Sequence, residues 1–135
     1  MTLDPAWVAD LVTRALAEDL GGPDGVDVTS VATIPADQID VVDMVARASG
    51  VVAGLSVAQA VFSAAGATAF EALVTDGTSV RRGDVLATIT GPTRALLTAE
   101  RTALNLISRA SGVATHTRRW AEAIEGTGAQ VLATR

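Results

Sequence analysis

The sequence predicts a mixed α+β fold in which helices and short strands alternate, followed by a mainly helical segment after Pro92. Three observations support this class. A capped helical pattern opens the chain, three strand-like runs separated by turn residues occupy the middle, and a long stretch of helical periodicity begins at Thr93. With 49% apolar and 19% charged residues in a chain of 135, the composition is typical of a folded domain.

The first helix is predicted between Pro5 and the Gly21-Gly22 pair. Asp4 is suited to cap it, Pro5 fits the first helical position, and the two glycines are typical of a helix end. Its apolar face consists of Val8, Leu11, Val12 and Ala15, with Leu16 at the margin. Residues 22–25 have the composition of a loop.

Strands are predicted at residues 41–48, 70–74 and 85–90, with turn signals at Asp76-Gly77 and at 82–84 between the later two. Residues 51–70 carry no charged side chain and are long enough to cross a bilayer. They are rich in small residues, however, and their pattern divides at Gly54. We therefore expect a short strand followed by a packed helix that ends at Gly66, and no membrane span.

After Pro92 the pattern is helical. Thr93 is predicted to cap a helix, a bend is expected at Ser111-Gly112, and a second helical stretch at 113–124 precedes a strand at 130–134. The positions spaced for burial are Leu96, Leu97, Ala103, Leu104 and Ile107. A lone terminal strand cannot satisfy its own backbone groups, so the chain is expected to stop at the start of a second domain.

The composition excludes several classes of function. A net charge of −5 argues against a nucleic-acid footprint and against an electrostatic membrane anchor, and the acidic start is unlike a signal peptide. Cysteine and lysine are absent and histidine occurs once, which excludes disulfides, thiolate zinc sites, Schiff bases and histidine-rich metal sites. All ten basic residues are arginines, whose planar guanidinium groups favour anion binding over proton transfer.

Arg101 is the first candidate for binding an anion. It follows Glu100 and lies one helical turn before Asn105. Two interpretations stay open: a solvated helix face with local ion pairs, or a guanidinium presented to a carboxylate. Thr134 and Arg135 form a second candidate, because a hydroxyl and a guanidinium at a strand end suit an acidic substrate. Arg135 could equally be a solvated terminus.

The histidine and the acidic loop residues are interpreted structurally. His116 lies between threonines on a helix, which is typical of a surface or packing residue. Asp24 and Asp27 lie near Glu18 and Asp19 but lack the spacing of a calcium loop, so capping of the loop is favoured. We assign no catalytic and no metal-binding residue to this chain.

Several short segments, each weak alone, are specific together in their order and spacing. They are Glu18–Gly21, Asp27–Ser30, Gly50–Leu55, Gly77–Val80 with Gly83-Asp84, Glu100–Asn105 and Ser111–Thr115. With them the chain resembles, over essentially its whole length, the amino-terminal portion of quinolinate phosphoribosyltransferases. These enzymes are also called decarboxylating nicotinate-nucleotide pyrophosphorylases.

The resemblance implies an architecture of two domains. Residues 1–108 would form an amino-terminal α/β sandwich domain of the hammerhead-like kind, including its long helix. Residues 109–135 would be the truncated start of a (β/α) barrel. In that family, carboxyl-terminal segments complete part of the sandwich domain.

The resemblance also implies a reaction in cytoplasmic NAD biosynthesis. Quinolinate and phosphoribosyl pyrophosphate would give nicotinate mononucleotide, pyrophosphate and carbon dioxide, with Mg²⁺ accompanying the phosphoribosyl pyrophosphate. Arg101 would reach into the active site of the partner subunit in a homodimer. Thr134 and Arg135 would line the quinolinate site.

Two departures from the family pattern affect what this chain does alone. Ala133 stands where the family usually has an acid, which changes the local hydrogen bonding at that strand end. The family's active-site lysines, a later arginine and the metal-binding acids would all lie beyond Arg135. The 135-residue chain is therefore predicted to be inactive by itself.

Three alternatives are considered. A paralogue associated with molybdenum transport, or a nicotinate phosphoribosyltransferase, would share the architecture. Residues 76–86 resemble the hairpin of biotinyl and lipoyl domains, but those domains need a lysine that this chain lacks. Finally, the chain could be a non-catalytic domain that dimerises through apolar surface.

Overall fold

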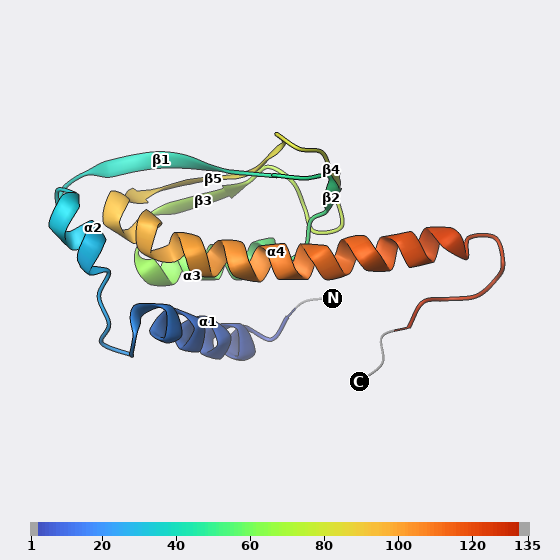
Figure 1. Cartoon of the computed structure of the whole chain (residues 1–135), viewed down its shortest axis with the longest axis horizontal. Coiled ribbons are helices and arrows are strands. Elements are labelled where there is room, and N and C mark those ends of the chain that lie inside the picture. Colours follow the sequence, from blue (N-terminus) through green and yellow to red (C-terminus); the bar gives the residue numbers. More distant parts are fainter. Residues whose placement is uncertain (1–2, 133–135) are drawn as a thin grey trace.

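A computed structural model describes residues 3–132. It places a three-stranded sheet on one side of a helical layer formed by α3 and α4, and α1 on the other side of that layer (Figure 1). The elements are α1 (Pro5–Leu20), α2 (Val28–Thr33), β1 (Ile39–Val45), β2 (Gly50–Val51), α3 (Leu55–Ala65), β3 (Ala69–Ala72), β4 (Ser79–Val80), β5 (Val85–Pro92) and α4 (Thr93–Ala123). The predicted α+β class is confirmed.

The main sheet is antiparallel with the order β1-β5-β3, and β2 pairs with β4 in a separate two-stranded sheet. In the β1–β5 ladder Val42 pairs with Ile89, and the register shifts between Met44 and Val45. The three predicted strands are confirmed. Because β4 and β5 do not pair with each other, residues 76–86 do not form the hairpin that the biotinyl or lipoyl interpretation requires.

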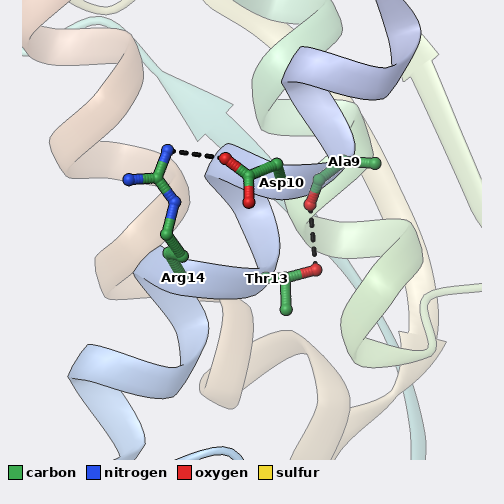
Figure 2. Close-up of polar contacts among 4 residues, drawn as sticks. All are labelled: Ala9, Asp10, Thr13 and Arg14. Carbon is green, nitrogen blue, oxygen red and sulfur yellow. Dashed lines mark hydrogen bonds and ion pairs between the residues drawn. The ribbon is translucent and has the colours of Figure 1, made fainter.

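Helix α1 follows its sequence signals closely. The Asp4 side chain accepts a hydrogen bond from the Ala6 N–H at 2.9 Å, and Gly21 ends the helix with φ of 81°. Val12 is the buried residue of the helix. On its outer face Arg14 contacts Asp10 at 2.7 Å, and the Thr13 hydroxyl donates to the Ala9 carbonyl (Figure 2).

The core lies between the sheet and the α3–α4 layer. Its largest fully buried side chains are Ile89 of β5, Val61 of α3, and Val52, which follows β2. Ala58 of α3 and Ala99 and Ala103 of α4 are completely buried, and such small side chains allow two helices to pack closely. Helix α3 ends at Gly66 as predicted. None of the helices in residues 3–132 combines the length and the apolar character needed to cross a bilayer.

Helix α4 is one continuous helix of 31 residues, so the predicted break at Ser111-Gly112 is wrong. The physical reason is tertiary. The Ser111 hydroxyl accepts a hydrogen bond from the Ala53 N–H at 3.0 Å, and the Thr115 hydroxyl accepts one from the Val51 N–H at 2.8 Å. These contacts hold the helix against β2, and they offset the cost of about 1 kcal/mol that a glycine adds to a helix interior.

Other details of the last segment also differ from expectation. Thr93 does not cap α4: Pro92 occupies the cap position, and the Thr93 hydroxyl donates to the Asp40 carboxylate at 2.5 Å. Leu97 and Leu104, expected to be buried, are 41% and 38% exposed, because the sheet and α3 cover only the adjacent face of α4.

The expected strand at 130–134 is not formed by residues 130–132, which have no neighbouring strand to pair with, and the rest of it lies outside the described residues. Helix α4 passes residue 108 without interruption, so the division into 1–108 and 109–135 stays a prediction.

Candidate functional site

The candidate site is a polar groove between α4 and the segment that joins α1 to α2. Its volume is about 610 Å³. One wall comes from the end of α1 and the start of α2, and the other comes from α4. The groove is lined by Asp19, Leu20, Val26, Asp27 and Val28 on the first wall and by Leu97, Thr98, Glu100, Arg101, Leu104 and Asn105 on the second.

Arg101 spans this polar groove. Its Nη1 donates to Oδ1 of Asp19 at 3.1 Å, which joins α4 to α1 across 82 positions of the sequence. The Arg101 side chain is 75% exposed, whereas the Asp19 side chain is only 17% exposed. An arginine has five N–H donors, and within the described residues the hydrogen bonds of this guanidinium go to Asp19 alone. The remaining donors are therefore available to a ligand.

The opposite wall is held in place by a tight loop. Gly21 adopts the left-handed conformation that turns the chain away from α1. At Gly25 a Cβ atom would lie 2.2 Å from the Leu20 carbonyl oxygen, so only glycine fits there. This close approach fixes the loop on the end of α1, and it positions Asp19 and Asp27 on the same side of the groove.

Asp27 caps α2 and carries a negative charge. Its carboxylate accepts hydrogen bonds from the Ser30 N–H at 3.0 Å and from the Ser30 hydroxyl at 2.5 Å. These bonds lower the pKa of Asp27 below its ordinary value of 3.8, and the positive charge of Arg101 adds a smaller effect in the same direction. The predicted capping role of Asp27 is confirmed.

The polar groove holds more negative than positive charge. Asp19, Asp27 and Glu100 line it together with the single guanidinium of Arg101. Among residues 3–132, no group of three or more histidine, aspartate or glutamate side chains is arranged to hold a metal ion. The groove alone is therefore poorly suited to bind a free anion. Its distinctive feature is the exposed guanidinium of Arg101.

The structure describes only part of the predicted site. Arg101 lies in the polar groove with Asn105, and its ion pair joins two elements far apart in sequence instead of neighbours on one helix. Thr134 and Arg135 lie outside the described residues. His116 is exposed, with its ring centroid 6.1 Å from that of Trp120, so its interpretation as a surface residue is confirmed.

Sequence reasoning did not identify Asp19 as the partner of Arg101. No periodic or spacing signal connects positions so far apart. The one available sign was that both residues belong to the segments that carry the family resemblance, Glu18–Gly21 and Glu100–Asn105.

A second, mostly apolar groove of about 880 Å³ lies on another side of α4. It runs between residues 42–52 and the face of α4 that includes Leu97, Leu104 and Ser111. Leu97 and Leu104 border both grooves, which accounts for their exposure.

Comparison with known proteins identifies the family. Residues 27–111 match the model of the quinolinate phosphoribosyl transferase N-terminal domain. The chain is 43% identical over 129 residues to a nicotinate-nucleotide pyrophosphorylase [carboxylating] of Mycobacterium leprae, covering 93% of this chain and 45% of that protein. It is 35% identical to quinolinate phosphoribosyltransferase [decarboxylating] 1b of Nicotiana tabacum, covering 93% and 35% respectively.

Solved structures agree with this result. The fold superposes on NadC from Streptococcus pyogenes with a TM-score of 0.83 at 32% identity, covering 92% of this chain and 44% of that one. It superposes on the nicotinate-nucleotide pyrophosphorylase from Francisella tularensis with a TM-score of 0.82 at 28% identity, covering 91% and 42%. The chain thus spans less than half the length of these relatives, and it belongs to the quinolinate phosphoribosyltransferase family, whose amino-terminal domain it carries.

Proposed function

We propose that this chain is the amino-terminal part of an enzyme that joins quinolinate to phosphoribosyl pyrophosphate. The products are nicotinate mononucleotide, pyrophosphate and carbon dioxide, a step of NAD biosynthesis. The family match and the names of the relatives support this assignment over a molybdenum-transport paralogue. A cytoplasmic location is part of the proposal; among the plant relatives, one is named as chloroplastic and three as mitochondrial.

The observation that carries the proposal is the exposed guanidinium of Arg101. Quinolinate is a pyridine with two carboxylates, and a planar guanidinium binds a carboxylate through two parallel N–H···O bonds. Such a contact fixes the orientation of the ring, and orientation brings its nitrogen to the sugar carbon that it attacks. Arg101 is thus proposed to bind and orient the substrate.

Arg101 is proposed to act on the active site of a partner subunit in a homodimer. Its 75% exposure and the excess of carboxylates in its own groove support this, because an exposed guanidinium can reach a neighbouring subunit and an acidic groove disfavours a bound dianion. Thr134 and Arg135 are proposed to line the quinolinate site.

Magnesium bound with the phosphoribosyl pyrophosphate would neutralise charge on the pyrophosphate leaving group. The described residues offer no suitable cluster of ligands, so we assign its binding to residues beyond Arg135 and derive no step through it.

The proposal is tested with a chimera. The 135-residue chain is fused to the carboxyl-terminal portion of the Mycobacterium leprae relative, which this chain does not cover. We expect the chimera to form nicotinate mononucleotide, and we expect neither portion alone to do so. Folding of each protein is checked by circular dichroism and size-exclusion chromatography.

Two variants of the chimera test the role of Arg101. Arg101→Ala is expected to lower kcat/KM by about 100- to 1000-fold, since a bidentate charged contact is lost. Arg14→Ala, which removes another exposed arginine, is expected to leave kcat/KM unchanged. A folded chimera without activity, or turnover by the 135-residue chain alone, would contradict the proposal.

A further inference from the structure

The described chain contains two Arg–Asp ion pairs with different surroundings. Arg14 and Asp10 lie on adjacent turns of α1 at 2.7 Å, with side chains 68% and 62% exposed (Figure 2). Pairs of this kind are mobile and contribute little. In the pair of Arg101 and Asp19 the carboxylate is largely buried and the guanidinium is exposed. In the second pair the carboxylate is thus held by its surroundings, and the guanidinium reaches it from the solvent-exposed side.

The fixed partner is Asp19. It lies in the last turn of α1, two residues before the left-handed Gly21, and the loop that follows is packed on the same turn through Gly25. A long arginine side chain loses considerable rotational freedom when it is ordered. A contact with a fixed carboxylate removes that freedom before a ligand arrives, which is how preorganisation improves binding.

The geometry of a guanidinium makes this compatible with ligand binding. Nη1 of Arg101 donates its hydrogen bond to Asp19, and the Nη2 and Nε donors remain for a second carboxylate. The negative charges of Asp27 and Glu100 on the groove walls oppose the entry of a dianion. We therefore expect the carboxylate that Nη2 and Nε of Arg101 bind to lie outside this groove.

We propose that Asp19 is a positioning residue for Arg101, which it holds at Nη1 so that the remaining donors meet a carboxylate of a pyridine dicarboxylate substrate. This inference rests on the proposed function, and it assigns to Asp19 a role in substrate affinity beyond the stability of the fold.

The first experiment measures the order of the Arg101 guanidinium in the 135-residue chain. The heteronuclear ¹⁵N NOE of the Arg101 Nε–H is expected to fall in Asp19→Ala. In Asp19→Asn it is expected to fall to an intermediate value, because the amide oxygen still accepts a hydrogen bond but carries no charge. The matched control Asp10→Asn is expected to leave the Arg101 signal unchanged. An Arg101 NOE that is the same in all three variants and in the parent chain would overturn the proposal.

The second experiment measures kinetics in the chimera described above. Asp19→Ala is expected to raise the KM for quinolinate by about 5- to 30-fold, with the KM for phosphoribosyl pyrophosphate and the melting temperature nearly unchanged. Asp19→Asn is expected to restore part of the affinity, and Asp10→Asn to have no effect. Equal changes in both KM values together with a lower melting temperature would indicate a structural role and overturn the proposal.

The two experiments separate this inference from the proposed function. If the folded parent chimera forms no nicotinate mononucleotide, the proposed function fails, while the NOE still decides whether Asp19 orders Arg101. If the chimera is active but its KM for quinolinate is insensitive to Asp19, the proposed function stands and the positioning role is rejected.

Discussion

The two halves of α4 are held in the molecule by different forces. All the buried side chains of the helix lie between Thr93 and Ile107, where α3 and the sheet cover it. From residue 108 to residue 123 no side chain is buried, and the attachment is polar. The Ser111 and Thr115 hydroxyls contact the segment around β2, and Arg118 donates to the Gly77 carbonyl at 3.3 Å. Figure 1 shows this second half extending past the sheet.

The difference explains where the candidate site lies. Arg101 is in the half whose position is fixed by apolar burial, so its Cα is held firmly even though its side chain is exposed. His116 and Trp120 are in the half attached through polar contacts, and they touch each other instead of the core. A residue that must reach a substrate precisely is better placed on the first half.

The largest expected effect is on the buried half. Ile107→Ala should lower the free energy of unfolding by about 2 to 5 kcal/mol, because it removes a side chain that is 4% exposed and leaves a cavity. Val113→Ala, at a position 64% exposed in the second half, should change it by less than about 0.5 kcal/mol. Urea unfolding of both variants measures the difference, and similar losses would contradict the division of α4.

The second effect concerns the polar attachment. Thr115→Val should cost about 1 to 3 kcal/mol, since the N–H of the buried Val51 loses its acceptor. Thr117→Val is the matched control, because the Thr117 hydroxyl donates only to the Val113 carbonyl within the same helix. The same urea titration applies. If Thr115→Val is no more costly than Thr117→Val, the contact with β2 does not anchor the second half.

The sequence signals succeeded where the cause of the structure is local. Asp4 and Gly21 delimit α1 through their own hydrogen bonds and conformation, and turn residues separate the strands of the main sheet. They missed α2 and β4, because six residues and two residues are too short to show a period. The resemblance, carried by widely spaced segments, indicated the family correctly.

The sequence signals failed where contacts between residues far apart in the sequence determine the structure. Ser111-Gly112 has the local chemistry of a helix end, yet the hydroxyl contact to Ala53 keeps the helix continuous. Helical periodicity predicted that Leu104 is buried, but it could not show that the neighbouring elements leave that side of α4 uncovered. In the same way the sequence could propose Arg101 as a candidate for anion binding, a role that stays a prediction, whereas its partner Asp19 became visible only in the fold.

A third, smaller effect tests the continuity of α4 at the junction of its halves. A Cβ atom at Gly112 would meet no atom within 4 Å, and its φ is not positive. Gly112→Ala should therefore stabilise the chain by about 0.5 to 1 kcal/mol, because alanine loses less backbone freedom than glycine in a helix. Thermal unfolding followed by circular dichroism at 222 nm measures the gain. A loss of stability would mean that the helix needs a flexible residue at this point.

The smallest effect concerns the acidic wall that faces the first half of α4. The bonds from Ser30 hold the pKa of Asp27 below its ordinary value, so protonation of Asp27 favours the unfolded state. The stabilising contribution is fully present above about pH 4, the ordinary range of an aspartate, and is lost as the pH falls through the lower pKa of the folded state. Asp27→Asn keeps a capping oxygen but cannot titrate. As the pH is lowered from about 5, the free energy of unfolding of Asp27→Asn should consequently decline less than that of the parent chain. Urea titration at each pH measures both values. If the free energies of unfolding of the two proteins fall in parallel with pH, the charge of Asp27 does not contribute to its contacts with Ser30 and Arg101.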